Sequence, residues 1–188
     1  MTDVSFLSDR GNAFEATFGE YGFSCQQVLP SAFGSPFCPP SRLLIIPSGF
    51  ADTKYYKILP ALERNEEKIR DFLEQGGIVL AFGAMIEDYE YTWLPMKLKY
   101  HMQFKNREVK VIDPDCPAAL LLAPGRKDCD GYFTEHDGET VMALDDGRPV
   151  LVHKRVGKGH IIAAALHEYP EKKFLEWACS KERKPITL

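Results

Sequence analysis

The order of apolar and polar positions predicts a β-α beginning for the chain. Residues 3–8 (DVSFLS) have the pattern of a strand, and residues 10–23 follow with aromatic side chains at helical spacing. Residues 24–29 suit a second short strand. The tract PSAFGSPFCPPS (30–41) is so rich in Pro, Gly and Ser that we expect a loop there.

The clearest pattern lies in the next part of the chain. RLLIIP (42–47) and GIVLAF (77–82) are continuous apolar runs, as expected for parallel strands covered on both faces. Between them, residues 61–75 carry an apolar stripe on a charged background and end at two glycines, which predicts a helix. This order predicts a right-handed βαβ unit. The stretch GGIVLAFGAMIEDY (76–89) has the pattern of a strand, a tight turn and a helix, on which many α/β enzymes mount a nucleophile.

The second half changes character. KLKYHMQF (97–104) and EVKVID (108–113) flank KNR with partial alternation, which predicts a hairpin. A short helix at PAALLLA (117–123) and a closing helix after Pro170 are also expected. Four further strands are predicted at GYFTEH, TVMALD, PVLVHKR and GHIIAAAL, the last two joined by a VGKG turn.

Together these elements predict one domain over residues 1–188, of the α/β class. We expect a mostly parallel, doubly wound sheet with helices on both faces, plus antiparallel hairpins in the C-terminal half.

Composition and charge narrow the classes of partner. The net charge is −4, with 23 basic and 27 acidic residues, and the basic residues are scattered. We therefore expect no nucleic-acid partner and no membrane partner. The first residues lack the positive charge of a signal peptide, which predicts a cytoplasmic protein. The five cysteines are odd in number and contain no C-x-x-C pair, so reduced thiols are expected.

Three segments resemble the class I glutamine amidotransferase-like superfamily, which has a flavodoxin-like α/β fold. They are LLIIPSGF, IRDFLEQGGIVLAFGA and GKGHIIAAALHEYPE, and they occur in the family's order and at about its spacing. The chain is also similar to amidotransferase-like segments found beside biotin-protein ligases and in glycosidase accessory domains. In those segments the fold persists without glutamine chemistry.

The resemblance also implies which catalytic groups have changed. Active members carry a cysteine nucleophile at a sharp turn after a strand, in a G-x-C-x-G pattern, and aligning VLAFGA on it puts Gly83 at the nucleophile. His167 matches the family's histidine, but Tyr169 falls where the carboxylate should be, and Glu168 lies one residue out of register. The oxyanion turn, Gly-Gly in many members, reads Ser48-Gly49 here.

Glutamine amidotransferase activity is therefore predicted to be absent, because no ionisable atom remains at Gly83. A glycine at this position can still keep a strained turn at positive φ, so we expect the elbow to persist without its chemistry.

The leading hypothesis is a non-catalytic amidotransferase-like domain that binds a small molecule or a protein partner at the former active-site cleft. We expect that cleft to be formed by Ser48, Gly49, Gly83, Ala84, Glu87 and His167. No cofactor and no metal site is assigned. The alternative is a hydrolase with relocated chemistry, in which His167 and Glu168 act as acid and base and Ser48 is a candidate substitute nucleophile.

Two further segments leave alternatives open. Residues 129–139 gather enough acidic, histidine and cysteine side chains to assist the hydrolase through a metal ion, although their spacing fits no zinc pattern and HDGE has the pattern of a solvated turn. The aromatic residues in 89–93 are either core or the contact of a homo-oligomer, the third hypothesis.

Overall fold

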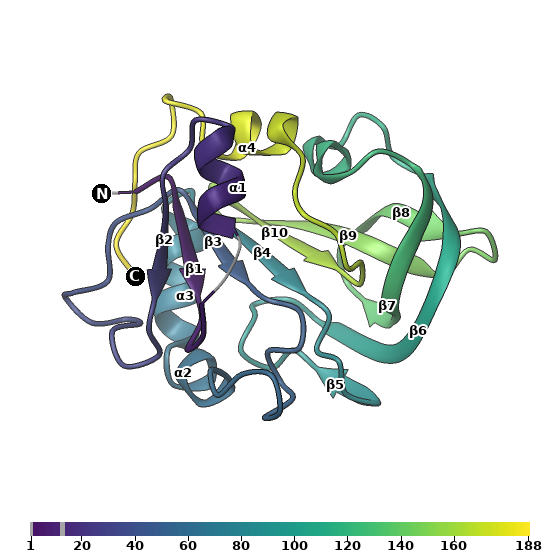
Figure 1. Cartoon of the computed structure of the whole chain (residues 1–188), viewed down its shortest axis with the longest axis horizontal. Coiled ribbons are helices and arrows are strands. Elements are labelled where there is room, and N and C mark those ends of the chain that lie inside the picture. Colours follow the sequence, from purple (N-terminus) through teal and green to yellow (C-terminus); the bar gives the residue numbers. More distant parts are fainter. Residues whose placement is uncertain (1, 12–13) are drawn as a thin grey trace.

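The computed structural model describes residues 2–11 and 14–188, which form one ten-stranded sheet with a few short helices (Figure 1). The strands are β1 (Val4–Leu7), β2 (Cys25–Val28), β3 (Leu43–Ile46), β4 (Ile78–Phe82), β5 (Asp88–Glu90), β6 (Leu98–Val111), β7 (Gly125–His136), β8 (Glu139–Leu144), β9 (Pro149–Val156) and β10 (Gly159–Ala164). The helices are α1 (Phe14–Glu20), α2 (Leu59–Arg64), α3 (Glu66–Glu74), α4 (Lys172–Ala178) and the 3-10 helix η1 (Pro117–Leu121).

One half of the sheet is parallel, in the order β2-β1-β3-β4-β10. Every residue of β1, β3 and β4 is buried, as the continuous apolar runs predicted. Side chains of α1 and α4 pack in one core cluster against one face, and those of α2 and α3 pack in a second cluster against the other face. The carboxyl ends of four strands, β1, β3, β4 and β10, therefore meet at one edge of the sheet.

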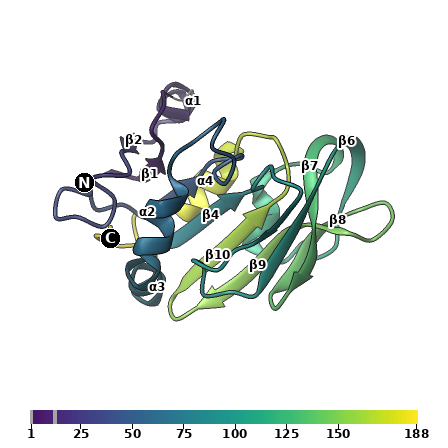
Figure 2. The same cartoon turned by 90° about the horizontal axis from the view of Figure 1, so that it is seen from below.

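The other half is antiparallel and continues from β10 through β9, β8 and β6 to β5. β7 lies off this path and pairs with β6. Figure 2 shows these strands on the side of the molecule away from α1 and the two termini.

The predicted fold class is wrong. The sheet is mixed, with four parallel and five antiparallel strand pairings, and only 18% of the described residues are helical against 37% in strands. After β4 the described chain forms no α-helix until α4. The chain between is rich in alternating and aromatic residues, which favour pleated strands over crossover helices.

The strand, turn and helix expected for residues 76–89 is also wrong. β4 forms as predicted, but residues 83–87 are irregular and lead into the edge strand β5. Tyr91 and Trp93 that follow are buried against Phe50, with ring centroids 5.4 and 5.5 Å away. Burial of these large rings overrides any helical tendency of the segment.

Smaller differences concern the lengths of the predicted strands and helices and the positions at which they are interrupted. The hairpin predicted around KNR is wrong, because β6 runs straight through it as a 14-residue strand with a bulge between Met102 and Lys105. The helix predicted for residues 61–75 is divided into α2 and α3 at Asn65, whose side-chain amide donates to the Ala61 carbonyl oxygen. Residues 12 and 13 of the helix predicted over 10–23 lie outside the described residues. No helix in the described part of the chain combines the length and apolar character needed to cross a bilayer.

Candidate functional site

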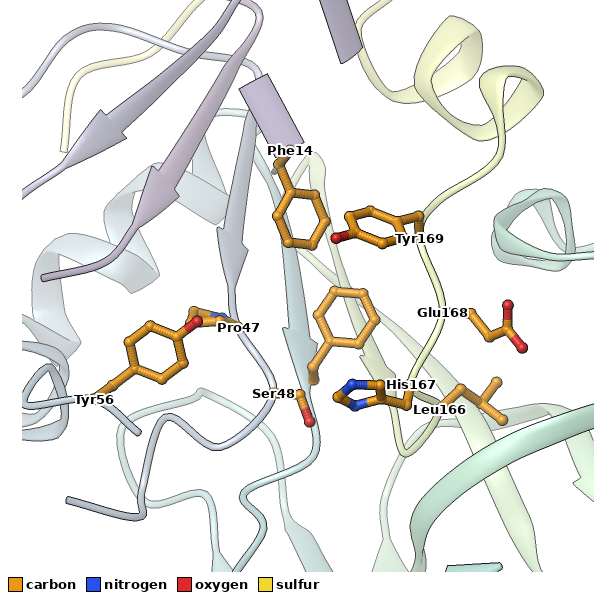
Figure 3. A pocket seen from close by; sticks show the side chains of 9 residues that line it. Phe14, Pro47, Ser48, Tyr56, Leu166, His167, Glu168 and Tyr169 are labelled. Atoms are coloured by element: carbon orange, nitrogen blue, oxygen red, sulfur yellow. The ribbon is translucent and has the colours of Figure 1, made fainter. Parts of the chain in front are cut away.

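A pocket of about 190 Å³ opens at the carboxyl edge of the parallel strands. Its lining comes from α1, from the segments that follow β3 and β10, and from the end of β4: Phe14, Pro47, Ser48, Tyr56, Phe82, Leu166, His167, Glu168 and Tyr169 (Figure 3). This edge is where open α/β sheets bind ligands, because the strands end there and their loops diverge. Three predicted site residues, Ser48, His167 and Glu168, are thus brought together.

Aromatic rings form most of the pocket wall. The rings of Phe14 and Tyr169 lie 4.9 Å apart between centroids, and Phe82 at the end of β4 also lines the pocket. Tyr56 closes the other side, and burial raises the pKa of its hydroxyl. Tyr169 is 50% exposed, so an apolar surface remains available to a ligand.

The floor of the pocket rests on a buried polar network centred on Asp130 of β7. The Ser48 hydroxyl donates to Asp130 Oδ2 over 2.7 Å. The Tyr100 hydroxyl lies 2.8 Å from the Asp130 carbonyl oxygen and 3.1 Å from Oδ1. Asp130 is 0% exposed, and burial raises the pKa of its carboxyl group, against the opposing effects of Ser48, Tyr100 and His167.

β7 reaches this floor by pairing antiparallel with the chain that continues β10, through a bridge between Cys129 and Leu166. The Asp130 amide donates to the Ala165 carbonyl oxygen over 3.3 Å, and the His167 amide donates to that of Asp128 over 2.8 Å. These two bonds hold Asp130 beneath Ser48 and fix where the chain turns toward His167.

Gly83 lies directly against the Asp130 carboxyl group. A Cβ atom at this position would lie 2.2 Å from Asp130 Oδ1 and 2.6 Å from Cγ, well inside contact distance. The space of a side chain at the aligned nucleophile position is therefore filled by Asp130. The expected positive φ is not at Gly83 but at Met85, whose φ is 55°. Gly83 is a glycine because of this close approach and not because of an elbow.

The backbone N–H of Gly49, in the predicted oxyanion turn, is already hydrogen-bonded within the protein. The Gly49 amide donates to the Gly83 carbonyl oxygen over 2.8 Å, so this N–H is not directed into the pocket. Gly49 has φ of 82°, which satisfies the turn after β3 and favours glycine there.

Two other predicted cleft residues do not line the pocket. Ala84 is fully buried in the core, and Glu87 is exposed at the end of the loop that leads to β5, where its carbonyl oxygen accepts from the Met102 amide. Both residues were expected in the cleft because of the strand, turn and helix predicted for residues 76–89. That arrangement does not form.

His167 and Glu168 share the pocket but differ in direction. The imidazole of His167 lies beside the Ser48 hydroxyl, whereas the Glu168 carboxylate extends away from the pocket (Figure 3). His167 is exposed and its ring lies 6.4 Å from that of Phe104. The one hydrogen bond that Ser48 Oγ donates among the described residues goes to Asp130 and not to His167.

The acidic and histidine side chains of residues 129–139 have separate partners and do not form one cluster. Glu135 pairs with Lys97 and Lys99, Asp137 pairs with Lys154, and Glu139 lies 3.5 Å from His153. Within residues 2–11 and 14–188, no group of three or more His, Cys, Asp or Glu side chains is placed to hold a metal ion. All five cysteines are free, and burial raises the pKa of Cys129 to about 11.

Two of the three aromatic residues in segment 89–93, Tyr91 and Trp93, lie in the core, which is one of the two interpretations of this segment. Tyr91 and Trp93 are each 1% exposed, and the Tyr91 hydroxyl donates to the Phe82 carbonyl oxygen over 2.9 Å.

Sequence reasoning missed Asp130 and Tyr100 as a pair. One signal was present: Gly131 follows Asp130 inside the strand, and a glycine inside a strand marks close approach of another group. A Cβ at Gly131 would lie 2.4 Å from the Tyr100 ring. Phe14 and Tyr56 carried no local signal, because only the fold brings them to the pocket.

Comparisons with known proteins support the fold alone. No family model and no curated protein matches the sequence. One chain of PurLQS from Thermotoga maritima superimposes with a TM-score of 0.58 at 15% identity, covering 98% of this chain and 100% of that one. A cytoplasmic protein from Salmonella typhimurium gives 0.58 at 14% identity, covering 98% and 99%.

A β-galactosidase from Rahnella sp. R3 gives a TM-score of 0.55 at 14% identity, covering 97% of this chain and 31% of that one. The chain spans about a third of the length of the β-galactosidases that it matches. At such identities a shared fold carries no activity with it.

Proposed function

We propose that this chain is a non-catalytic amidotransferase-like domain that binds a small molecule in the pocket at the carboxyl edge of its parallel strands. One observation carries the proposal: the Asp130 carboxyl group fills the space of a side chain at Gly83 and accepts the hydroxyl proton of Ser48. Neither position then supplies a nucleophile, while the pocket above them stays open.

The positions of the three family-like segments support the relation to the amidotransferase-like superfamily. They contain β3, β4 and β10, which are adjacent, parallel strands with their carboxyl ends at the pocket. Residues far apart in sequence thus meet where the family's catalytic groups would lie.

The shape and lining of the pocket support a small ligand more than a protein partner. Its volume of about 190 Å³ is below the roughly 300–1,000 Å³ of sites for drug-sized ligands, so it suits a compact molecule. A concave, mostly aromatic lining with a few polar groups at the floor is the usual composition of such sites.

A hydrolase with relocated chemistry is the second candidate, because Ser48, His167 and Glu168 line one pocket. Two features weigh against it. The Ser48 proton is directed to Asp130, and the Glu168 carboxylate extends away from the other two groups. A general acid or base must reach the reacting atoms, and Glu168 does not.

Thermal unfolding in the presence of the small-molecule fraction of a cell extract tests the proposal. A ligand stabilises the folded state by mass action, so the wild type should unfold at a higher temperature with the extract. Tyr169→Ala removes half-exposed pocket surface and should lose that shift, whereas Phe37→Ala, at a side chain 87% exposed outside the pocket, should keep it.

The same samples separate the two candidates. The binding domain should leave added glutamine and activated esters unhydrolysed. Turnover that disappears in a folded His167→Ala variant would instead establish the hydrolase, and an extract shift that survives in Tyr169→Ala would remove this pocket as the binding site.

A further inference from the structure

The direction of the Ser48 proton determines what the pocket floor offers to a ligand. Ser48 Oγ lies 2.7 Å from Asp130 Oδ2, and the Tyr100 hydroxyl lies 3.1 Å from the other carboxyl oxygen, so two hydroxyl donors converge on one buried carboxyl group. A hydroxyl has one proton and two lone pairs. With its proton directed to Asp130, Ser48 presents lone pairs to the pocket and requires a donor from whatever binds there.

The remaining lining argues against a charged ligand. Among the described residues that line the pocket, only His167 and Glu168 have His, Asp, Glu, Lys or Arg side chains, and the Glu168 carboxylate extends away from the pocket. The Asp130 carboxyl lies beneath the floor with both oxygens engaged by hydroxyl groups. A charged group buried without a facing counter-charge has a large desolvation penalty, so a neutral ligand fits best.

The walls argue for a flat ring with few polar atoms. Four of the residues that line the cavity carry aromatic rings: Phe14, Tyr56 and Tyr169, which Figure 3 shows, and Phe82. Aromatic surfaces stack favourably on planar rings and bury both faces of them. A polyhydroxylated ligand would leave hydroxyl groups without partners here, and an unpaired buried hydroxyl group weakens binding.

The geometry points to a small neutral nitrogen heterocycle as the ligand, with its ring N–H donated to Ser48 Oγ and its faces against Phe82 and Tyr169. This inference rests on the proposed binding function of the same pocket. His167, beside Ser48, can supply either a donor or an acceptor to a neighbouring ring atom, because a neutral imidazole has one of each.

Matched pairs of probes test the donor directly. Indole is compared with 1-methylindole, and uracil with 1,3-dimethyluracil, by calorimetric titration of the whole protein. Each N–H compound should bind at least about tenfold more tightly than its methylated partner, because methylation removes the donor and leaves a buried acceptor unpaired.

Two variants separate the hydrogen bond from the stacking. In Ser48→Ala the preference for the N–H compound should shrink to about twofold, because the variant lacks the serine oxygen that accepts the hydrogen bond from the ligand. Tyr169→Ala should weaken both members of each pair, and it keeps the inference testable if Ser48→Ala fails to fold. Phe37→Ala should bind as the wild type does.

Either of two results would overturn the inference: equal affinity for methylated and unmethylated probes, or no binding of any probe by the wild type. In both cases a Tyr169-dependent stabilisation by the cell extract would leave the proposed binding function standing with a ligand of another class. If the wild type bound none of the probes and was not stabilised by the extract, the inferred ligand class and the proposed binding function would both be contradicted.

Discussion

Asp130 accounts for the identity of several residues that lie far from it in sequence. Its carboxyl group accepts from Ser48, contacts the Tyr100 hydroxyl, and lies where a side chain at Gly83 would have to be. A glycine at Gly83 was expected for positive φ, and the structure gives a steric reason instead. Local sequence shows that a glycine is present but cannot show which distant side chain requires it.

Replacing Gly83 by alanine should destabilise the fold. The added Cβ would lie 2.2 Å from Asp130 Oδ1, and overpacking of a rigid interior usually costs about 1–3 kcal/mol in the free energy of unfolding. Chemical denaturation measures the loss. Gly19→Ala is the matched control, because nothing lies within 4 Å of its Cβ and alanine favours a helix. Equal stability of both variants would contradict the close packing at Gly83.

Asp130→Asn should change how stability depends on pH. Burial raises the pKa of Asp130 in the folded protein above its value of 3.8, so the folded state holds this proton to higher pH than the unfolded state does. The corresponding stability is fully present below pH 3.8 and is lost as pH rises through the folded pKa. The wild type should therefore lose stability relative to Asp130→Asn as pH rises above 3.8, in denaturation series at several pH values. A difference that does not vary with pH would argue against a titrating buried carboxyl group.

Among the strands, two histidines on neighbouring β9 and β10 should produce the opposite dependence. His153 Nε2 lies 2.9 Å from His160 Nδ1, and burial, with the charges of His153, Arg183 and Arg155, lowers the pKa of His160 to about 4. Burial also lowers the pKa of His153, against the opposing effect of Glu139. Neutral imidazoles are therefore favoured in the folded state.

Because the unfolded state takes up these protons first, stability should be fully present above pH 6.5 and should fall as pH decreases toward 4. Removal of one titrating group in His160→Gln should flatten this part of the curve. Urea denaturation at pH 7, 5.5 and 4.5 compares the two proteins, and an unchanged slope in the variant would show that this pair does not titrate on unfolding.

The strands themselves show what local pattern can and cannot predict. β3 and β4 were predicted at nearly their observed bounds because continuous apolar runs leave few alternatives. β6 was misjudged as a hairpin because Lys105, Asn106 and Arg107 resemble a turn. In the structure they continue a strand whose partner β7 supplies the pairing, with Asn106 bonded to Asp128. Whether such a segment turns or continues as a strand depends on its pairing with a distant segment. That pairing cannot be seen in a single sequence.

The whole molecule combines a parallel half that forms the pocket with an antiparallel half that supplies its floor. Ser48 and His167 were predicted as site residues because they match the oxyanion turn and the histidine of the amidotransferase-like superfamily, and both follow strands of the parallel half. Asp130 comes from β7, of which the sequence predicted only residues 131–136 as a strand, and nothing in the local pattern placed that strand beneath Ser48. Ser48 and His167 therefore line one pocket at the parallel strand ends, whereas Ala84 and Glu87, whose expected placement depended on a helix after β4, lie outside it.

An NMR titration of uniformly ¹⁵N-labelled protein tests the central claim most directly. The small-molecule fraction of a cell extract and glutamine are added to one sample. The account predicts that amide signals of Ser48, Gly49 and residues 167–169 shift while the glutamine signal stays constant. Conversion of glutamine to glutamate, or shifts confined to residues outside the pocket, would contradict it.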